Sequence, residues 1–150
     1  MRRALFVTLG LLLAIQLVPV SRTGLGAGVE RVEAPPAVLD LLRRACADCH
    51  SQATVWPWYS RIAPVSWLIA HDVNDGREHL DLSTLPSLRP RRKAKLLAEI
   101  AEEVDEGAMP TRLYRLVHPE ARLDAAGQRT LVEWATQAKT AALQAVPAAR

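Results

Sequence analysis

Both cysteines of the chain lie within one short segment, and a histidine follows the second of them directly. Cys46, Cys49 and His50 form the pattern C-x-x-C-H inside the segment "ACADCHSQATVWPWYS". The apolar spacing before the pattern predicts a helix, on which positions i, i+3 and i+4 share one face. This geometry suits covalent attachment of one haem c, with two thiols bonded to its vinyl groups and the imidazole as proximal iron ligand.

Two other uses of a C-x-x-C pattern fit this chain less well. A structural zinc site needs four ligands from Cys and His, and only the dispersed His71, His79 and His118 remain to complete one. A redox dithiol of the thioredoxin type expects surrounding βαβ units, which the sequence does not predict. Both alternatives, and a chance match to a short pattern, stay open at this point.

A haem iron has a second axial position, and Met109 is the first candidate to fill it. It lies far along the chain from His50 and is the one methionine besides the initiator. A thioether suits haem iron, and Met/His ligation raises the reduction potential. Met109 could instead fill a gap in the core. His118 is the second candidate for the ligand, whereas His71 and His79 are expected at the surface or in hydrogen bonds.

The segment "WPWYS" and the arginine after it could form the wall of the haem pocket. Trp56, Trp58 and Tyr59 offer large apolar faces with one polar group each. Arg61 is close enough in sequence to pair with a haem propionate. The alternative is that these aromatic residues, with Trp67 and Trp134, are ordinary core residues.

The hydrophobic periodicity predicts helices and no β-strand, so we expect an all-α domain. A Gly/Pro-rich tether is expected to precede Pro36, which suits the first turn of a helix. Gly107 is expected to terminate a helix, and Asp124 to cap the next one. Segments 51–63 and 108–123 are expected as loops or short turns. The predicted helices are 36–50, 64–80, 91–106 and a last one after Asp124 that carries Leu131, Trp134, Ala135 and Ala138 on one side.

The segment 1–22 is expected to be a membrane anchor or a signal peptide. Arg2 and Arg3 precede a mostly apolar run from Ala4 to Val20, which would reach about 26 Å as a helix. In either case the rest of the chain is exported, to the periplasmic side of a bacterial inner membrane. We therefore expect residues 23–35 to be a linker and residues 36–145 to be the haem-binding domain.

The charge of the folded part excludes the usual basis for nucleic-acid binding. The net charge of +3 equals the contribution of Arg2, Arg3 and Arg22, because no Asp or Glu precedes Glu30. The remaining basic and acidic residues balance, so no basic stripe is predicted.

The third predicted helix carries opposite charges at its two ends. "RPRRKAK" at residues 89–95 is basic and "EIAEEVDE" at residues 99–106 is acidic. One interpretation is a solvated face with intrahelical pairs such as Lys95–Glu99. The other is an acidic rim beside Met109 that steers a basic redox partner.

Several of these segments together resemble the bacterial haem-binding domain family of small c-type haem proteins. The resemblance is carried by "RRACADCHSQATVWPWYSRIAPVSWLIAHDVNDGREHL", by "EIAEEVDEGAMPTRLYRLVHPEARL" and by a final Leu-x-x-Trp helix, and covers about residues 34–140. It implies haem on Cys46 and Cys49, with His50 and Met109 as iron ligands. Thr111 departs from the family, which often has a second proline there.

The layout is also similar, more distantly, to class I cytochrome c, with a bundle of about four helices around one haem. In that arrangement Trp134 would lie where the last helix crosses the first. The sequence thus predicts an electron carrier and no catalytic residues. The alternatives are a haem enzyme or gas sensor with a labile sixth ligand, or an accessory haem subunit of a larger oxidoreductase.

Overall fold

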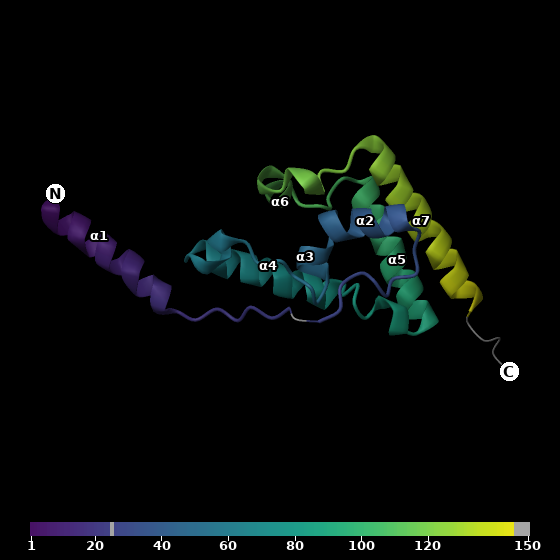
Figure 1. Ribbon diagram of the computed structural model, residues 1–150, viewed down its shortest axis with the longest axis horizontal. Helices are drawn as coiled ribbons and strands as arrows, with labels where there is room; N and C mark the ends of the chain where they lie inside the picture. Colours follow the sequence, from purple (N-terminus) through teal and green to yellow (C-terminus); the bar gives the residue numbers. More distant parts are fainter. Residues whose placement is uncertain (25, 146–150) are drawn as a thin grey trace.

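The computed structural model describes residues 1–24 and 26–145, and this part of the chain contains helices and no β-strand (Figure 1). The prediction of an all-α protein is therefore confirmed. The α-helices are α1 (Arg2–Ala14), α2 (Pro36–Ala45), α3 (Ala47–His50), α4 (Val65–His79), α5 (Pro90–Asp105), α6 (Arg112–Val117) and α7 (Ala125–Gln144). Short 3-10 helices are η1 (Ile15–Leu17), η2 (Trp58–Arg61), η3 (Leu85–Ser87) and η4 (Pro119–Ala121).

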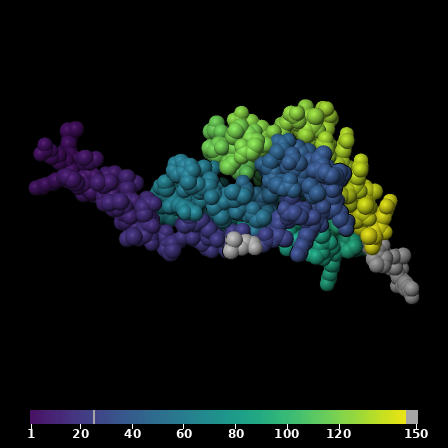
Figure 2. Space-filling model, viewed as in Figure 1, coloured from purple at the N-terminus to yellow at the C-terminus, as the bar shows by residue number. Residues whose placement is uncertain are grey.

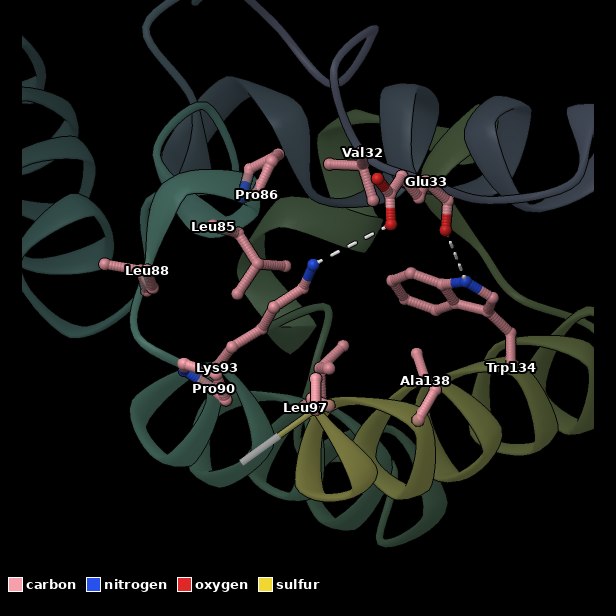
Figure 3. Close-up of a pocket in the computed structure, with 13 residues that line it drawn as sticks. Val32, Glu33, Leu85, Pro86, Leu88, Pro90, Lys93, Leu97, Trp134 and Ala138 are labelled. Atoms are coloured by element: carbon pink, nitrogen blue, oxygen red, sulfur yellow. Dashed lines mark hydrogen bonds and ion pairs between the residues drawn. The ribbon is translucent and has the colours of Figure 1, made fainter. Parts of the chain in front are cut away.

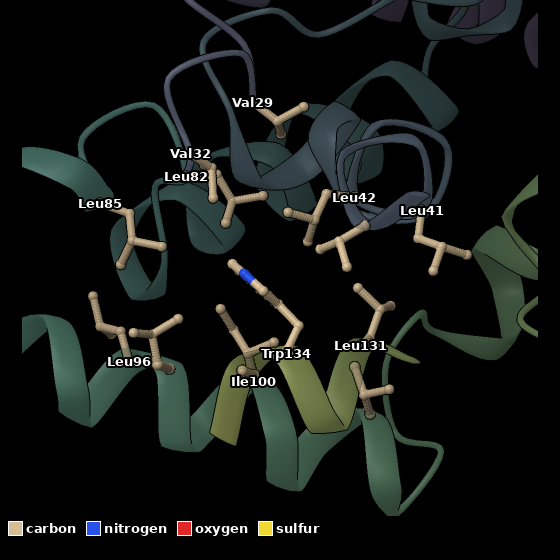
Figure 4. Packing of buried hydrophobic residues seen from close by; sticks show 14 of the residues in the cluster. Val29, Val32, Leu41, Leu42, Leu82, Leu85, Leu96, Ile100, Leu131 and Trp134 are labelled. Carbon is tan, nitrogen blue, oxygen red and sulfur yellow. The ribbon is translucent and has the colours of Figure 1, made fainter. Parts of the chain in front are cut away.

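The core lies where α5 and α7 pack along each other and α2 crosses them (Figures 1 and 4). Each helix contributes residues at spacings of three and four, so that one apolar stripe faces the others. Trp134 of α7 is the one large aromatic side chain of this cluster. The most deeply buried members are Val29, Val38, Leu42, Leu82, Leu85, Leu97, Leu131 and Ala135.

The helix boundaries follow local signals that the sequence carries. Pro36 occupies the first turn of α2, where its missing N–H costs no hydrogen bond. The carboxylate of Asp124 accepts a 2.7 Å hydrogen bond from the N–H of Gly127 and caps α7. Gly107 has a φ of 68° after α5, a conformation that glycine adopts at little cost. All three predictions are confirmed.

The helix that was expected to carry the whole C-x-x-C-H motif is divided at Cys46. Cys46 has φ −127° and ψ −35°, outside the helical region. Cys46 N–H still donates to the carbonyl of Leu42, and the Cys46 carbonyl accepts from His50 N–H. The chain therefore bends without losing these hydrogen bonds, and α3 turns Cys49 and His50 toward α4.

The segment predicted as a loop between residues 108 and 123 contains helix α6. Thr111 starts it, because its hydroxyl oxygen accepts a hydrogen bond from Tyr114 N–H at 3.4 Å. Threonine is a preferred N-cap residue. The two prolines of this segment suggested a loop, but Pro110 precedes the helix and Pro119 follows it.

The segment expected as a linker packs against the domain for much of its length. Val29 and Val32 are buried in the core. Gly26 N–H donates to the carbonyl of Gln52 at 2.8 Å, and the indole N–H of Trp134 donates to the carbonyl of Glu33 at 3.3 Å. The segment therefore contacts the chain after the motif through Gly26 and helix α7 through Glu33.

Helix α1 projects from one end of the folded body, and its apolar side chains are exposed (Figure 2). It continues as η1 to Leu17. Among residues 1–24 and 26–145, no helix is both long enough and apolar enough to cross a membrane. The transmembrane helix expected in segment 1–22 is therefore not found.

Candidate haem site

One cavity of about 560 Å³ brings together the four residues that were expected to hold haem. Cys46, Cys49 and His50 line it from the motif, and Met109 lines it from the loop before α6. The volume falls in the range of cofactor sites, roughly 300–1,000 Å³. Apolar side chains from α2, α5 and the segment after α4 complete the wall: Leu42, Ala45, Leu80, Leu82, Leu96, Ile100 and Val104.

The ring of His50 is fixed by two backbone carbonyl groups at the end of α4. Its Nδ1 lies 2.8 Å from the carbonyl oxygen of Gly76 and 3.0 Å from that of Leu80. Carbonyl oxygens only accept hydrogen bonds, so Nδ1 must carry the proton. In the neutral ring Nε2 then carries no proton and is available to a metal, the arrangement that protein second shells give to ligating histidines.

Gly76 also allows α4 to lie directly against the attachment motif. A Cβ atom on Gly76 would lie 2.9 Å from the carbonyl oxygen of Cys49 and 3.2 Å from its Cβ. Any side chain at position 76 would therefore push α3 away from α4. The segment that resembles the family includes Gly76, but no role was predicted for it from the sequence. A glycine inside a predicted helix was the feature that could have indicated a close packing contact.

Arg77 holds the chain that leaves the motif. Its guanidinium donates to the carbonyl of Ser51 at 2.8 Å and to the hydroxyl of Thr54 at 2.6 Å. It also donates to the hydroxyl of Thr23 at 2.6 Å. One side chain thus ties α4, the loop after His50 and the segment before α2 together.

The two thiols are free and protonated at neutral pH in this structure. Burial, and next the neighbouring Cys49, raise the pKa of Cys46 to about 12. Burial, followed by the charges of Asp48 and Asp72, raises the pKa of Cys49 to about 11. Reactive redox dithiols have lowered thiol pKa values, so this environment does not favour the redox alternative.

The donor set also disfavours zinc. Within the part of the chain that the structure describes, no group of three or more His, Cys, Asp or Glu side chains could hold a metal ion. Two thiols, the imidazole of His50 with a free Nε2 and one thioether, set in a largely apolar cavity, fit a haem instead. His79 also lines the cavity, and its Nδ1 lies 2.9 Å from the carbonyl oxygen of Asp75.

Met109 lies at the edge of the cavity on a short connection between two helices. Its side chain is 36% exposed. Its N–H donates to the carbonyl of Glu103 at 3.0 Å, and the next residue, Pro110, is buried. The backbone of Met109 is thus tied to the end of α5, while Thr111 caps α6 on the other side.

His118, the second candidate for a distal ligand, is not among the residues that line the cavity. Both of its ring nitrogens are engaged: Nε2 lies 2.8 Å from the hydroxyl of Tyr59, and Nδ1 lies 2.9 Å from the carboxylate of Glu120. Its ring stacks on that of Tyr114 at a centroid distance of 4.3 Å. His118 therefore supports the lining residue Tyr114 from outside the cavity.

Tyr114 is a lining residue that sequence reasoning missed. Its hydroxyl donates to the carboxylate of Asp48 at 2.7 Å. Asp48 stands between the two cysteines and also accepts from Val55 N–H at 3.0 Å. Burial and this hydrogen bond raise the pKa of Tyr114. The feature that could have revealed it is Thr111. As an N-cap residue, Thr111 would have predicted a helix that contains Tyr114.

The aromatic segment that was expected to form the cavity wall lies elsewhere. Trp56, Trp58, Tyr59 and Arg61 are not among the lining residues. Trp58 is 74% exposed and Arg61 is exposed, while Tyr59 binds His118. The reason is that the chain between Ser51 and Pro57 leads away from the motif toward the start of α4 before η2 begins.

Carboxylates of α4 and α5 line one side of the cavity. Asp72 and Asp75 come from α4, and Glu99 and Glu103 from α5. Burial raises the pKa of Asp72. The expected pair between Lys95 and Glu99 is present at 3.3 Å. We call these four carboxylates the acidic lip.

A second pocket, of about 380 Å³, lies on the other side of the core between α5, η3 and α7 (Figure 3). Lys93 and Glu33 form an ion pair of 3.9 Å across it, and Trp134 forms one wall. It contains no cysteine, histidine or methionine.

Comparison with known families agrees with the chemistry of the larger cavity. Residues 10–137 match the model of the haem-binding domain family. The matched range contains the C-x-x-C-H motif, Gly76, Met109 and Tyr114. The chain therefore belongs to the haem-binding domain family. No curated protein and no solved structure matched the chain.

Proposed function

We propose that this haem-binding protein is a monohaem, c-type, cytochrome-like electron carrier. Cys46 and Cys49 would hold the haem through two thioethers, with His50 as proximal and Met109 as distal iron ligand. The observation that carries the proposal is that all four residues line one apolar cavity. The packing of α2 against α7, with Trp134 in the core, supports the likeness to a cytochrome c fold.

Each residue has a defined task in this proposal. Bound haem supplies an iron that changes between the ferric and ferrous states. The carbonyl groups of Gly76 and Leu80 hold the imidazole of His50 with Nε2 free. The apolar wall excludes water, which tunes the potential of the site. Electron transfer needs no catalytic acid or base, so we propose that the protein is not an enzyme.

The place of action is proposed from the N-terminal segment. Helix α1 begins with two arginines, Arg2 and Arg3, and is apolar beyond them. We infer that α1 associates with the bacterial inner membrane, and that the haem domain faces the periplasm. If the segment is cleaved as a signal, the domain is a free periplasmic protein.

A basic redox protein is the proposed partner. The acidic lip lies on the cavity that holds Met109, and none of the lining residues is Lys or Arg. Complementary charge raises association rates at low salt. We therefore expect the rate of electron exchange with a basic donor or acceptor to fall as ionic strength rises.

Carbon monoxide separates an electron carrier from the other haem functions. The holoprotein with Met109 bound should cycle reversibly through one electron and should bind no carbon monoxide in the ferrous state. Rapid carbon monoxide binding by the wild-type protein would contradict the proposal and favour an enzyme or gas sensor with an open site. Failure to exchange electrons with every soluble donor or acceptor would favour an accessory subunit.

A further inference from the structure

A row of apolar side chains is exposed at the end of the body where α4 begins. We call this row the α4 corner. Its members follow one another at spacings of three or four residues, through the loop, η2 and the first turn of α4. Their exposures are 74% for Val55, 74% for Trp58, 46% for Ile62, 42% for Val65 and 47% for Leu68.

The α4 corner is joined to the end of the apolar N-terminal helix. The side chain of Gln16, in η1, accepts a hydrogen bond from Ala63 N–H at 2.9 Å and donates one to the Ala63 carbonyl at 3.1 Å. Ala63 lies between Ile62 and the first turn of α4. Figures 1 and 2 show α1 leaving the body at this end, opposite α5 and α7. The exposed surface of α1 therefore continues into the α4 corner.

The corner segment itself contains no acidic residue; two carboxylates border it, that of Asp48, which accepts from Val55 N–H, and that of Glu120, which His118 joins to Tyr59. No Asp or Glu occurs between Asp48 and Asp72, and the first acidic residue of the chain is Glu30. Arg61 is the one charged side chain within the corner segment, and it is exposed. An apolar surface with an exposed tryptophan and a basic residue matches the interfacial zone of a bilayer, where tryptophan lies at headgroup depth and anionic lipids attract cations.

We infer that the α4 corner rests on a lipid bilayer, with Trp58 at the level of the headgroups. The inference rests on the proposed membrane association of α1 and adds a second contact that orients the haem domain. Gly76, which lines the haem cavity, lies further along α4 than Val65, about 16 Å away along the helix axis. Asp72, the first carboxylate of the acidic lip, lies one turn beyond Leu68, about 6 Å along the helix axis, so the lip begins where the α4 corner ends.

Spin labels on introduced cysteines test this orientation in the full-length holoprotein, whose own cysteines are occupied by thioethers. The labelled positions are Trp58→Cys and Leu68→Cys in the corner, with Leu116→Cys on α6 as the matched exposed control. The vesicles contain phosphatidylethanolamine and phosphatidylglycerol. Collisions with oxygen, which concentrates in lipid, are compared with collisions with a water-soluble nickel chelate.

The expected result is a severalfold rise in the ratio of oxygen to nickel collisions at positions 58 and 68 on adding vesicles, and no rise at position 116. Equal ratios at all three positions on bound vesicles overturn the inference but leave the association of α1 intact. Absence of vesicle binding overturns both. If the corner labels are shielded from the nickel chelate without vesicles, and light scattering shows a particle larger than one chain, the inference is overturned. A second copy of the chain would then cover this surface.

A substitution without a label gives an independent check. Ile62→Asp places a charge in the α4 corner and should weaken vesicle binding severalfold, whereas Leu113→Asp on α6 should leave it unchanged. Covalent haem content, measured by mass, reports whether either variant still folds. If the wild-type chain reacts with the spin label, its own cysteines are free. That result would refute the proposed thioethers without bearing on the membrane contact. Unchanged vesicle binding by a folded Ile62→Asp variant overturns the inference.

Discussion

The Nδ1 atom of His50 lies 2.8 Å from the carbonyl oxygen of Gly76. The same glycine allows α4 to touch the backbone of Cys49, because any Cβ atom there would overlap it. Gly76 therefore fixes the tautomer of the proposed iron ligand together with Leu80, and it also sets the distance between the motif and α4.

Gly76→Ala should disturb the site more than its small size suggests. The new Cβ would meet the Cys49 carbonyl oxygen at 2.9 Å, and overpacking of this kind costs about 1–3 kcal/mol. We expect a lower free energy of unfolding in urea and less covalent haem per chain by intact mass. Gly10→Ala is the matched control, because its Cβ would meet nothing within 4 Å. Equal haem content in both variants would show that the contact is unimportant.

Met109→Ala should lower the reduction potential while the haem stays attached. Loss of the thioether removes the ligand that raises the potential, and a fall of roughly 100 mV or more is expected. The ferrous variant should also bind carbon monoxide. Leu113→Ala and His118→Gln serve as controls, since neither residue lines the cavity. An unchanged potential in Met109→Ala would eliminate Met109 as the ligand.

Tyr114→Phe tests the contact between α6 and the motif. The variant loses the 2.7 Å hydrogen bond to the Asp48 carboxylate, and hydrogen bonds to charged groups contribute about 1.5–3 kcal/mol. We expect a decrease of about 2 kcal/mol in the free energy of unfolding. Tyr59→Phe, which loses a hydrogen bond to His118 outside the cavity, should cost less. The reverse order would argue against a role for Tyr114 at the site.

The thiols of the haem-free chain should resist alkylation. With its pKa raised from 9.0 to about 11, Cys49 at pH 8 has about a hundredth of the thiolate of an ordinary cysteine. The rate of reaction with iodoacetamide should fall accordingly and recover in urea. Because the folded chain holds these protons more tightly than the unfolded chain, its stability should decrease as pH rises above about 9. Equal rates with and without urea would contradict the buried position of the thiols.

The sequence was sufficient for α2, α4, α5 and α7 and for the four residues that meet in the cavity. The spacing of C-x-x-C-H by itself indicates haem attachment. Met109 could be selected because the chain has no other methionine besides the initiator. Caps at Asp124 and Gly107 are local signals, so the ends of the helices could be predicted from short stretches. The motif and the two caps could be predicted because each depends on residues that are near neighbours in the chain.

The remaining features depend on contacts between distant segments. The chain bends at Cys46, and the α3 helix that follows packs on Gly76 of another helix, which is remote from the motif in the sequence. The aromatic segment from Trp56 to Tyr59 had the composition of a haem wall, but the direction of the chain after Ser51 takes it away from the cavity. Nearness in sequence to the motif was a poor guide to nearness in space.

The central claim, that Cys46 and Cys49 hold one haem covalently, is tested most directly by intact mass after extraction with acidified acetone, combined with a pyridine haemochrome spectrum. The account predicts a polypeptide that keeps the mass of one haem, a haemochrome typical of two thioethers, and a shifted haemochrome with one thioether in Cys46→Ala. A wild-type chain that gives up its haem to acetone and returns to the mass of the bare polypeptide would contradict the account.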